Sequence, residues 1–256
     1  MTLAPAGRRF RAVWLGRAAY QPTLELQRSL MARRIAGTVG DTLLLVEHPA
    51  VITLGRGAKA DHVLAASALL AARGIDVVET ERGGDVTYHG PGQLVGYPLF
   101  DLHPDRQDVR RYVRDLVTVM ARLCADHGVA AGPRSDLIGC WVDADRPARW
   151  EGHEAAARPA KIGAVGVKLA RWVTMHGFAL NVTTRLADFD LIVPCGIREH
   201  PMTSLEALEA LGVHDSPAME TVARRAAAHV SAVFSSDLEA FETADSAAGW
   251  LRGDPA

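Results

Sequence analysis

Residues 161–182 read Lys161-Ile-Gly-Ala-Val-Gly-Val-Lys-Leu-Ala-Arg-Trp-Val-Thr-Met-His-Gly-Phe-Ala-Leu-Asn-Val182. The run is rich in β-branched and small apolar residues. Together with the residues before it, from Leu137 onward, it predicts consecutive strands with turns at Gly152 and Gly177. Strands that follow one another through short turns pair antiparallel. The stretch therefore favours a largely antiparallel sheet.

Two lysines and two glycines in this stretch indicate how it faces its surroundings. In an extended strand, residues an odd number apart point to opposite faces. Lys161 and Lys168 are therefore expected on opposite faces, so at most one of them belongs to a functional site. Gly163 and Gly166 carry no side chain, which leaves room for a slender apolar ligand. The alternative is that these glycines only permit close packing of neighbouring strands.

Strands and helices alternate through the rest of the chain. We expect strands at Phe10–Leu15, Thr42–Glu47, Val51–Leu54 and Ile75–Thr80, and helices at Pro22–Ala36, Asp61–Arg73, Val109–His127, Ser204–Leu211 and Ala218–Phe234. This order indicates an α+β fold with a mixed, largely antiparallel sheet flanked by helices. No repeat or linker divides the chain, so residues 10–234 are predicted to form a single domain. Residues 1–9 and 235–256 are expected to be flexible tails, and the aperiodic residues 145–160 a mobile surface loop.

The composition is that of a compact globular protein. The chain has 256 residues, 48% of them hydrophobic, and a net charge of −2, so it can bury one large core. Basic and acidic residues are interspersed, which argues against nucleic acid as a partner. We expect no signal peptide and no membrane span, because no segment approaches the roughly 20 apolar residues that a span requires. The three cysteines match no zinc spacing, so we expect reduced thiols, no metal and a cytoplasmic location.

Cys195 and Lys161 are the candidate catalytic residues. Cys195 lies in a Pro-Cys-Gly turn after an apolar strand-like run, which is expected to direct the thiol into a cleft. Lys161 is notable because the chain has 25 Arg but only three Lys. Lysine, unlike arginine, has a pKa that can be tuned, so it can both stabilise a thiolate and exchange protons. A thiolate beside an ammonium indicates acyl transfer. Cys124 and Cys140 are expected to be buried, inert thiols.

Residues 82–96 contain more glycine than a pair of strands needs. These glycines clear side chains from one patch of backbone, so that a ligand can meet N–H donors while His89 and Gln93 point to the same place. Backbone N–H groups near Gly83, Gly84 or Cys195 are candidates for holding an oxyanion. The alternative is a hairpin whose glycines only serve turns. Neither Gly-x-x-x-x-Gly-Lys-Ser/Thr nor Gly-x-Gly-x-x-Gly after a strand, the two glycine motifs that bind phosphate groups, occurs in the chain. No nucleotide or other cofactor is therefore expected.

Four segments together resemble the octanoyltransferases of lipoate biosynthesis, the lipoyl(octanoyl) transferases. In chain order they are Glu47-His-Pro-Ala-Val-Ile-Thr-Leu-Gly-Arg56, Arg82-Gly-Gly-Asp-Val-Thr-Tyr-His-Gly-Pro-Gly-Gln93, Lys161-Ile-Gly-Ala-Val-Gly166 with Met175-His-Gly-Phe-Ala-Leu-Asn181, and Pro194-Cys-Gly-Ile197. The resemblance runs from about Phe10 to Phe234. It implies a biotin/lipoate protein ligase-like catalytic domain. It also implies transfer of an octanoyl group from octanoyl-acyl carrier protein to a lysine of a lipoyl domain, as the first step of endogenous protein lipoylation.

The resemblance also implies partners and site residues. The implied acceptors are the lipoyl domains of 2-oxoacid dehydrogenase complexes and the glycine cleavage H protein. The family's cysteine nucleophile falls on Cys195, and the lysine that lowers its pKa falls on Lys161. The family's acyl-substrate contacts fall on Arg82, Gly83, Gly84, Asp85, Val86, Thr87, Tyr88, His89, Ala164, Val165, Gly166, Gly177, Phe178 and Ala179. His176 is a further candidate, and it and His89 are equally open to a structural role.

Two other functions fit the same residues. An ATP-dependent lipoate or biotin protein ligase shares the implied fold, but it needs a nucleotide and magnesium and has no need of a nucleophilic cysteine. A Cys–His thiol hydrolase would pair Cys195 with His89 or His176.

Overall fold

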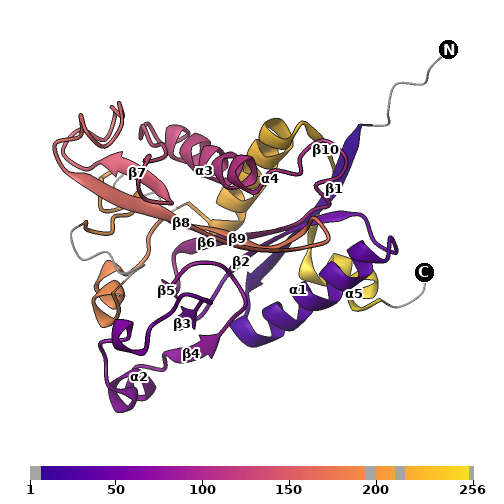
Figure 1. Ribbon diagram of the computed structural model, residues 1–256, viewed down its shortest axis with the longest axis horizontal. Helices are drawn as coiled ribbons and strands as arrows, with labels where there is room; N and C mark the ends of the chain where they lie inside the picture. Colours follow the sequence, from indigo (N-terminus) through magenta and orange to yellow (C-terminus); the bar gives the residue numbers. More distant parts are fainter. Residues whose placement is uncertain (1–6, 194–199, 211–216, 254–256) are drawn as a thin grey trace.

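A seven-stranded sheet forms the centre of the computed structural model, which describes residues 7–193, 200–210 and 217–253 (Figure 1). Its strands lie in the order β10-β1-β2-β6-β9-β8-β7. Their bounds are β1 (Arg8–Arg17), β2 (Asp41–Glu47), β6 (Gln93–Leu99), β7 (Cys140–Asp143), β8 (Pro159–Ala170), β9 (Val173–Asn181) and β10 (Ser236–Thr243). The pairs β10–β1 and β1–β2 are parallel, and the other four are antiparallel. The predicted α+β class, with a mixed and largely antiparallel sheet, is confirmed.

Helices cover both faces of this sheet. Helices α3 (Val109–Ala125) and α4 (Met219–Phe234) lie on one face, and α1 (Tyr20–Ile35) and α5 (Ala244–Arg252) on the other (Figure 1). Strand β2 alternates accordingly: Leu43 and Leu45 pack toward α3 and α4, whereas Leu44 and Val46 pack toward α1. Because both faces are covered, the whole of β2 is buried.

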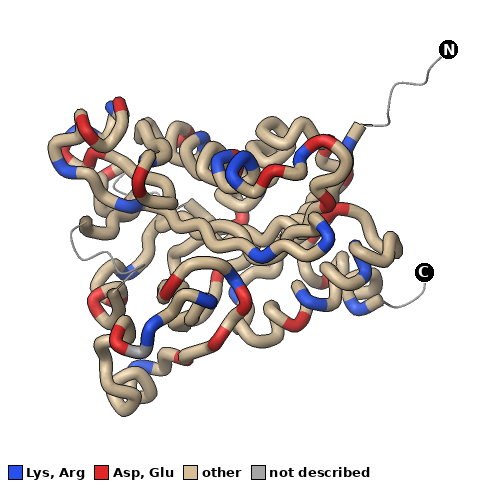
Figure 2. Tube along the Cα trace, viewed as in Figure 1, with Lys and Arg blue, Asp and Glu red and all other residues tan. Residues whose placement is uncertain are grey.

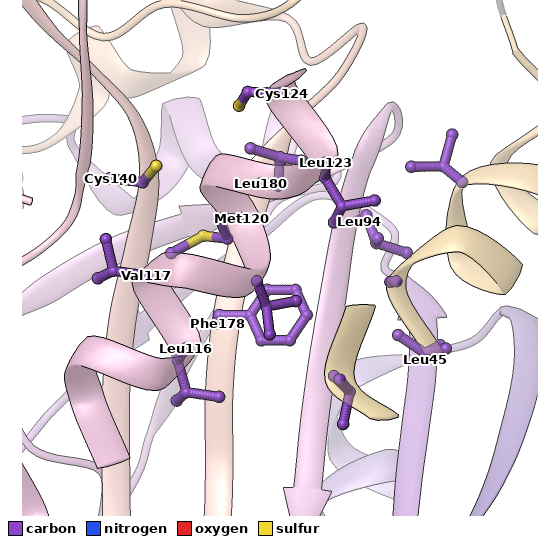
Figure 3. Packing of buried hydrophobic residues seen from close by; sticks show 14 of the residues in the cluster. Leu45, Leu94, Leu116, Val117, Met120, Leu123, Cys124, Cys140, Phe178 and Leu180 are labelled. Carbon is purple, nitrogen blue, oxygen red and sulfur yellow. The ribbon is translucent and has the colours of Figure 1, made fainter. Parts of the chain in front are cut away.

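The core on the α3 side is built by a helical stripe. Leu116, Met120 and Leu123 recur at helical spacing on α3 and contact Phe178 and Leu180 of β9 (Figure 3). Burying each such side chain stabilises the fold by roughly 1.5–3 kcal/mol. The same cluster contains Cys124 and Cys140, which are free and fully buried. Their expected burial is confirmed. The hydrogen bond with Cys124, followed by burial, raises the pKa of the Cys140 thiol well above its usual value.

A second, three-stranded sheet lies beside the first. It has the order β4-β3-β5, with β4 (Asp76–Glu79), β3 (Val51–Leu54) and β5 (Val86–His89). Around it lie α2 (Ser67–Ala72) and the 3-10 helices η1 (Ala60–His62) and η2 (Leu186–Leu191). Strand β5 runs into β6 through Gly90–Gly92, so the chain passes directly from the small sheet into the large one. This connection places residues 82–89 against the large sheet.

Strands β8 and β9 form the hairpin that the opening stretch predicts, but its turn is elsewhere. The turn residues are Arg171 and Trp172, with φ of 50° and 63°. Gly177 lies inside β9, opposite Gly166 of β8, so the turn predicted at Gly177 is wrong. Two left-handed residues are what a two-residue hairpin requires, and they are usually Asn or Gly. Arg-Trp gives no such signal in the sequence.

A β-bulge overturns the prediction that Lys161 and Lys168 point to opposite faces. Trp141 of β7 pairs with Lys161, but Cys140 pairs with Gly163, so β8 has one extra residue at this point. The extra residue reverses the alternation beyond it. Val165 and Val167 pack toward α3, whereas Lys168 approaches Glu81 on the other side. Lys161 lies over the ring of Trp141, whose neighbours Cys140 and Val142 face α3. Both lysines therefore lie on the face away from α3.

Three further predictions are wrong in part. The helix expected at Asp61–Arg73 begins only at Ser67, after the short 3-10 helix. The described part of Ser204–Leu211 forms turns, with Leu208 N donating to Ser204 O. The expected tail 235–256 contains β10, which pairs with β1, and α5, whose last carbonyls accept hydrogen bonds from Arg33. Strand β10 lies at the edge of the sheet and is only partly buried, so its sequence is polar and rich in small residues and lacks the apolar run that predicts a strand.

Charged residues are distributed over both sheets and all layers. Figure 2 shows Lys and Arg interspersed with Asp and Glu along the trace. Many of them pair, as Arg34 does with Asp41 (2.7 Å). Within the described residues, none of the helices combines the length and the apolar character that crossing a membrane demands.

Candidate functional site

A pocket lies between the small sheet and the face of the large sheet that turns away from α3. Its cavity volume is small, about 40 Å³. The lining comes from α1, β5, β6, β8 and β9 and from the turn before β5. The lining residues are Tyr20, Arg82, Gly84, Thr87, His89, Val95, Tyr97, Ala164, Val165, Gly166, His176, Gly177, Phe178 and Ala179.

The structure brings the two predicted groups of substrate contacts together in this pocket. Arg82, Gly84, Thr87 and His89 line it from one side, and residues 164–166 and 177–179 from the other. The further candidate His176 lines it as well. Segments about 80 positions apart in the sequence therefore share one site.

Four of the predicted contact residues lie outside the pocket lining. Val86 and Tyr88 point to the opposite face of β5, into a core with Phe189, and Tyr88 Oη donates to Asp188 (2.9 Å). Gly83 N–H donates to Val167 O (2.9 Å), so this N–H is already used and does not suit an oxyanion. Asp85 pairs with His62. Side chains alternate between the two faces of a strand, so Val86 and Tyr88 point away from the pocket while Thr87 and His89 point into it. The predicted contacts took all eight residues of the motif together and ignored this alternation.

Glycines let two backbones cross at the pocket wall. A Cβ on Gly166 would lie 3.1 Å from both Arg82 Cδ and Gly83 O, which is tighter than ordinary contact. A Cβ on Gly55 would meet Gly84 O and Arg82 Nη1. These glycines serve close approach of chain segments as well as clearance for a ligand.

Arg82 places a buried positive charge under the pocket. Its side chain is 7% exposed and its Nη2 donates to Thr53 O (2.6 Å) and Thr53 Oγ1 (2.9 Å). Burial lowers the pKa of His176 to about 3, and the Arg82 charge is the second cause. Burial likewise lowers the pKa of His89 to about 3. Both imidazoles are therefore neutral at physiological pH.

A chain of buried hydrogen bonds holds His89. Its Nδ1 lies 2.6 Å from Gln93 Oε1, Gln93 Nε2 donates to Asn181 Oδ1 (2.9 Å), and Asn181 Nδ2 donates to Thr203 O (2.9 Å). Thr203 N in turn donates to Lys161 O (2.9 Å). Because Gln93 Oε1 only accepts, Nδ1 of the neutral His89 carries the proton. The chain therefore ties the pocket wall to the strand that carries Lys161.

Lys161 is buried beside the pocket face of β8. It is 4% exposed, and its Nζ lies 5.7 Å from the centroid of the Trp141 ring. Its backbone N donates to Pro201 O (2.9 Å). Gly139 has φ of 147°, and a Cβ there would collide with Lys161 Cε. The lysine side chain thus depends on a glycine that makes room for it.

Cys195 lies outside the described residues, but both flanks of its segment are placed. Before it, Val193 N donates to His62 O (2.8 Å), and after it, Pro201 O accepts from Lys161 N (2.9 Å). His62 also pairs through Nδ1 with Asp85. The described residues on either side of this segment therefore lie beside His62 and Lys161.

Three pocket residues were missed in the sequence. Tyr20 begins α1, and Val95 and Tyr97 lie on one face of β6. His48 supports them, with Nε2 2.9 Å from Tyr97 Oη and Nδ1 2.7 Å from Ala18 O. Alternation within β6 could have placed Val95 and Tyr97 on one face, but no local signal says which face holds the pocket.

Comparisons with known proteins show the family of this chain. Residues 19–231 match the family model of the lipoyl protein ligase A/B catalytic domain. An octanoyltransferase from Chloroflexus aurantiacus is 48% identical over 222 residues, which are 86% of this chain and 92% of that protein. An octanoyltransferase from Myxococcus xanthus is 53% identical over 192 residues, which are 75% of this chain and 51% of that protein.

A solved structure has the same fold. It is a bi-partite lipoate protein ligase from Thermoplasma acidophilum, described with its E2 lipoyl domain, and it covers 96% of this chain with a TM-score of 0.68 and 14% identity. At this identity the match supports the expected ligase-like fold alone. From the family model and the close relatives, the chain belongs to the lipoyl protein ligase A/B catalytic-domain family and, within it, to the octanoyltransferases.

Proposed function

We propose that this enzyme transfers an octanoyl group from octanoyl-acyl carrier protein to a lysine of lipoyl domains through a thioester on Cys195. The observation that carries the proposal is the pocket in which the 82–89 and 164–179 segments meet, on the same face of β8 as Lys161. The lipoyl domain described with the Thermoplasma ligase supports this class of acceptor. The glycine cleavage H protein is proposed as a further acceptor on the resemblance alone.

The proposed reaction has two displacements. The Cys195 thiolate attacks the thioester carbonyl of the donor, a new S–C bond forms and the donor's C–S bond breaks. The carrier leaves as a thiolate that takes a proton from the Lys161 ammonium, which becomes a neutral amine. The acceptor amine then attacks the acyl-enzyme, an amide forms, and the Cys195 thiolate is released. A thioester is already activated, so no ATP is consumed.

Lys161 has two roles in this proposal. As an ammonium it stabilises the Cys195 thiolate, and as a neutral amine it takes the proton from the incoming lysine. Its anchoring to Pro201 supports these roles, because Pro201 follows Cys195 by only six positions.

The hydrolase alternative fits the pKa values of the two candidate histidines less well. A general base works best with a pKa near the operating pH, whereas burial lowers the pKa of both His89 and His176 to about 3. The ligase alternative remains distinguishable by its need for a nucleotide.

Intact-mass measurement after mixing the enzyme with octanoyl-acyl carrier protein, without ATP, tests the proposal. We expect one octanoyl unit on the enzyme that neutral hydroxylamine removes. Cys195→Ser should not form this labile adduct, whereas Cys124→Ser, which alters a core thiol, should form it as the wild type does. A labile adduct on Cys195→Ser, or one that forms only with ATP, would refute the proposal.

A further inference from the structure

His176 has a buried ring whose nitrogens bond to nothing in the part of the chain that the structure describes. The residue is 1% exposed, and neither Nδ1 nor Nε2 has a hydrogen-bond partner. Gln27 of α1 adds a third such atom, because its Nε2 is also buried without a partner. Gln27 Oε1 accepts the backbone N–H of His176 (3.1 Å), so the two residues adjoin. Leaving a buried polar atom unpaired costs roughly 1–3 kcal/mol.

The backbone of His176 is strained in a way that aims the ring at the pocket. Thr174 pairs with Leu169, which packs on the α3 side, and Phe178 packs on that side too, so regular alternation would turn His176 toward α3. Instead its φ is 59°, and its ring meets Tyr97 edge-on at 6.4 Å on the opposite face, where it lines the pocket. Such a conformation costs on the order of 1–3 kcal/mol. The fold maintains an unpaired polar ring in the pocket at some expense.

The ring lies at the end of the pocket remote from Lys161. Along β8, Lys161 comes before Ala164 and Gly166, and His176 is paired with Val167, which follows Gly166. An acyl chain whose carbonyl is held near Lys161 would run past Ala164 and Gly166 toward His176. Its last carbons would be the atoms that approach the imidazole.

We propose that His176 and Gln27 form a polar floor at the end of the acyl slot and set the longest chain that the enzyme accepts. The inference rests on the proposed function. The neutral imidazole offers one donor and one acceptor, and Gln27 Nε2 offers donors. Water or a hydroxyl can satisfy them, but a methyl group cannot. A chain long enough to reach the floor must displace that hydration without replacing its hydrogen bonds, which weakens binding.

The polar floor can be tested on the wild-type enzyme with matched donors. Two series of acyl-carrier-protein thioesters are compared, with the same number of heavy atoms in each pair but a terminal methyl in one and a terminal hydroxyl in the other. At the length where kcat/KM of the methyl series falls off, we expect the hydroxyl donor to be better by roughly five- to tenfold. An apolar floor would favour the methyl donor at every length, and that result would overturn the proposal.

Two variants then assign the effect to His176. His176→Ala removes the polar ring, so the hydroxyl preference should vanish and decanoyl should gain on octanoyl. His176→Asn opens similar space but keeps polar atoms and tolerates the left-handed backbone, so decanoyl should gain little. Equal gains in both variants, at comparable melting temperatures, would mean that volume alone sets the length and would overturn the polar floor.

Calorimetric binding of the matching free acids separates this inference from the proposed function, because it needs no transfer. If no donor is turned over but the hydroxy acid binds better than its methyl counterpart, the proposed reaction fails and the floor stands. If donors are turned over and the methyl acid binds better at all lengths, the reaction stands and the floor fails.

Discussion

Lys161 and Lys168 lie on the same face of β8, although seven positions separate them, because the bulge opposite Cys140 and Trp141 inserts one residue between them. Their surroundings nevertheless differ. Lys161 is buried against the Trp141 ring, whereas Lys168 Nζ lies 3.9 Å from Glu81 Oε1 and its side chain is 23% exposed. Both lysines therefore face the pocket side of the sheet, but only Lys161 is buried, and its backbone N–H donates to Pro201 O.

This contrast predicts different outcomes for matched substitutions. Lys161→Arg keeps a charge but cannot become neutral, so transfer should fall by about 10²-fold or more. Lys168→Arg keeps the surface pairing with Glu81 and should stay within about twofold. Steady-state octanoyl transfer is the measurement, with circular dichroism to verify folding. Equal losses in two folded variants would show that Lys161 has no special role.

The strand crossing at Gly177 should be sensitive to a single methyl group. A Cβ there would collide with Gly96 O and approach Pro98 Cδ, and the backbone oxygen cannot rotate away. Gly177→Ala should lower the free energy of unfolding by about 1–3 kcal/mol. Gly40→Ala is the control, because no atom lies within 4 Å of its added Cβ, and it should change stability by about 0.5 kcal/mol or less. The measurement is urea unfolding of both variants. A Gly177→Ala variant with the wild-type free energy of unfolding would contradict the packing argument.

Ala164 should limit the length of the acyl chain from the side of the slot. It lines the pocket on β8, and the larger side chain of Ala164→Leu would occupy space that the acyl chain needs. Each methylene of the substrate that is then excluded from the pocket loses roughly 0.8 kcal/mol of binding free energy. Hexanoyl donors should then gain on octanoyl donors. The measurement is the octanoyl-to-hexanoyl ratio of kcat/KM, with melting temperature as the control. If the variant only disturbs strand packing, all donors should suffer alike and the ratio should stay at the wild-type value.

Acid should destabilise the fold through its buried histidines. Burial lowers the pKa of His48 to about 4 and of His89 and His176 to about 3, whereas an unfolded histidine has a pKa of about 6.5. The unfolded chain therefore binds more protons between these values. The stabilising contribution is fully present above about pH 6.5 and is lost as the pH falls.

Between pH 6.5 and pH 5 each of these histidines should lose about 1.6 kcal/mol of its contribution. Melting temperatures measured over this range should fall steeply for the wild type and less steeply for His48→Gln, which removes one of the titrating rings. A wild-type melting temperature that does not change from pH 6.5 to pH 5 would contradict the prediction that these buried histidines stay neutral in the folded protein.

The sequence alone determined most of the regular elements and the composition of the pocket. Helix α3 follows from its apolar stripe because helical periodicity is a local property, and strands β1 to β4 follow from apolar, β-branched runs. The glycine-rich segment 82–89 and the segments 164–166 and 177–179 were identified as candidate contacts from their residues and their resemblance to a family. That Cys195 is the nucleophile stays a prediction.

Only the tertiary structure decided which side chains meet. The bulge in β8 depends on pairing with β7, a non-local partner. One extra residue is enough to bring Lys168 to the same face of the sheet as Lys161. The left-handed backbone at His176 turns its ring from the α3 side into the pocket, and no neighbour in the sequence signals this. Strand β10 forms because β1 offers an unpaired edge. Residue type constrains local conformation, but the direction of a side chain depends on register, and register is set by partners that lie far away in the chain.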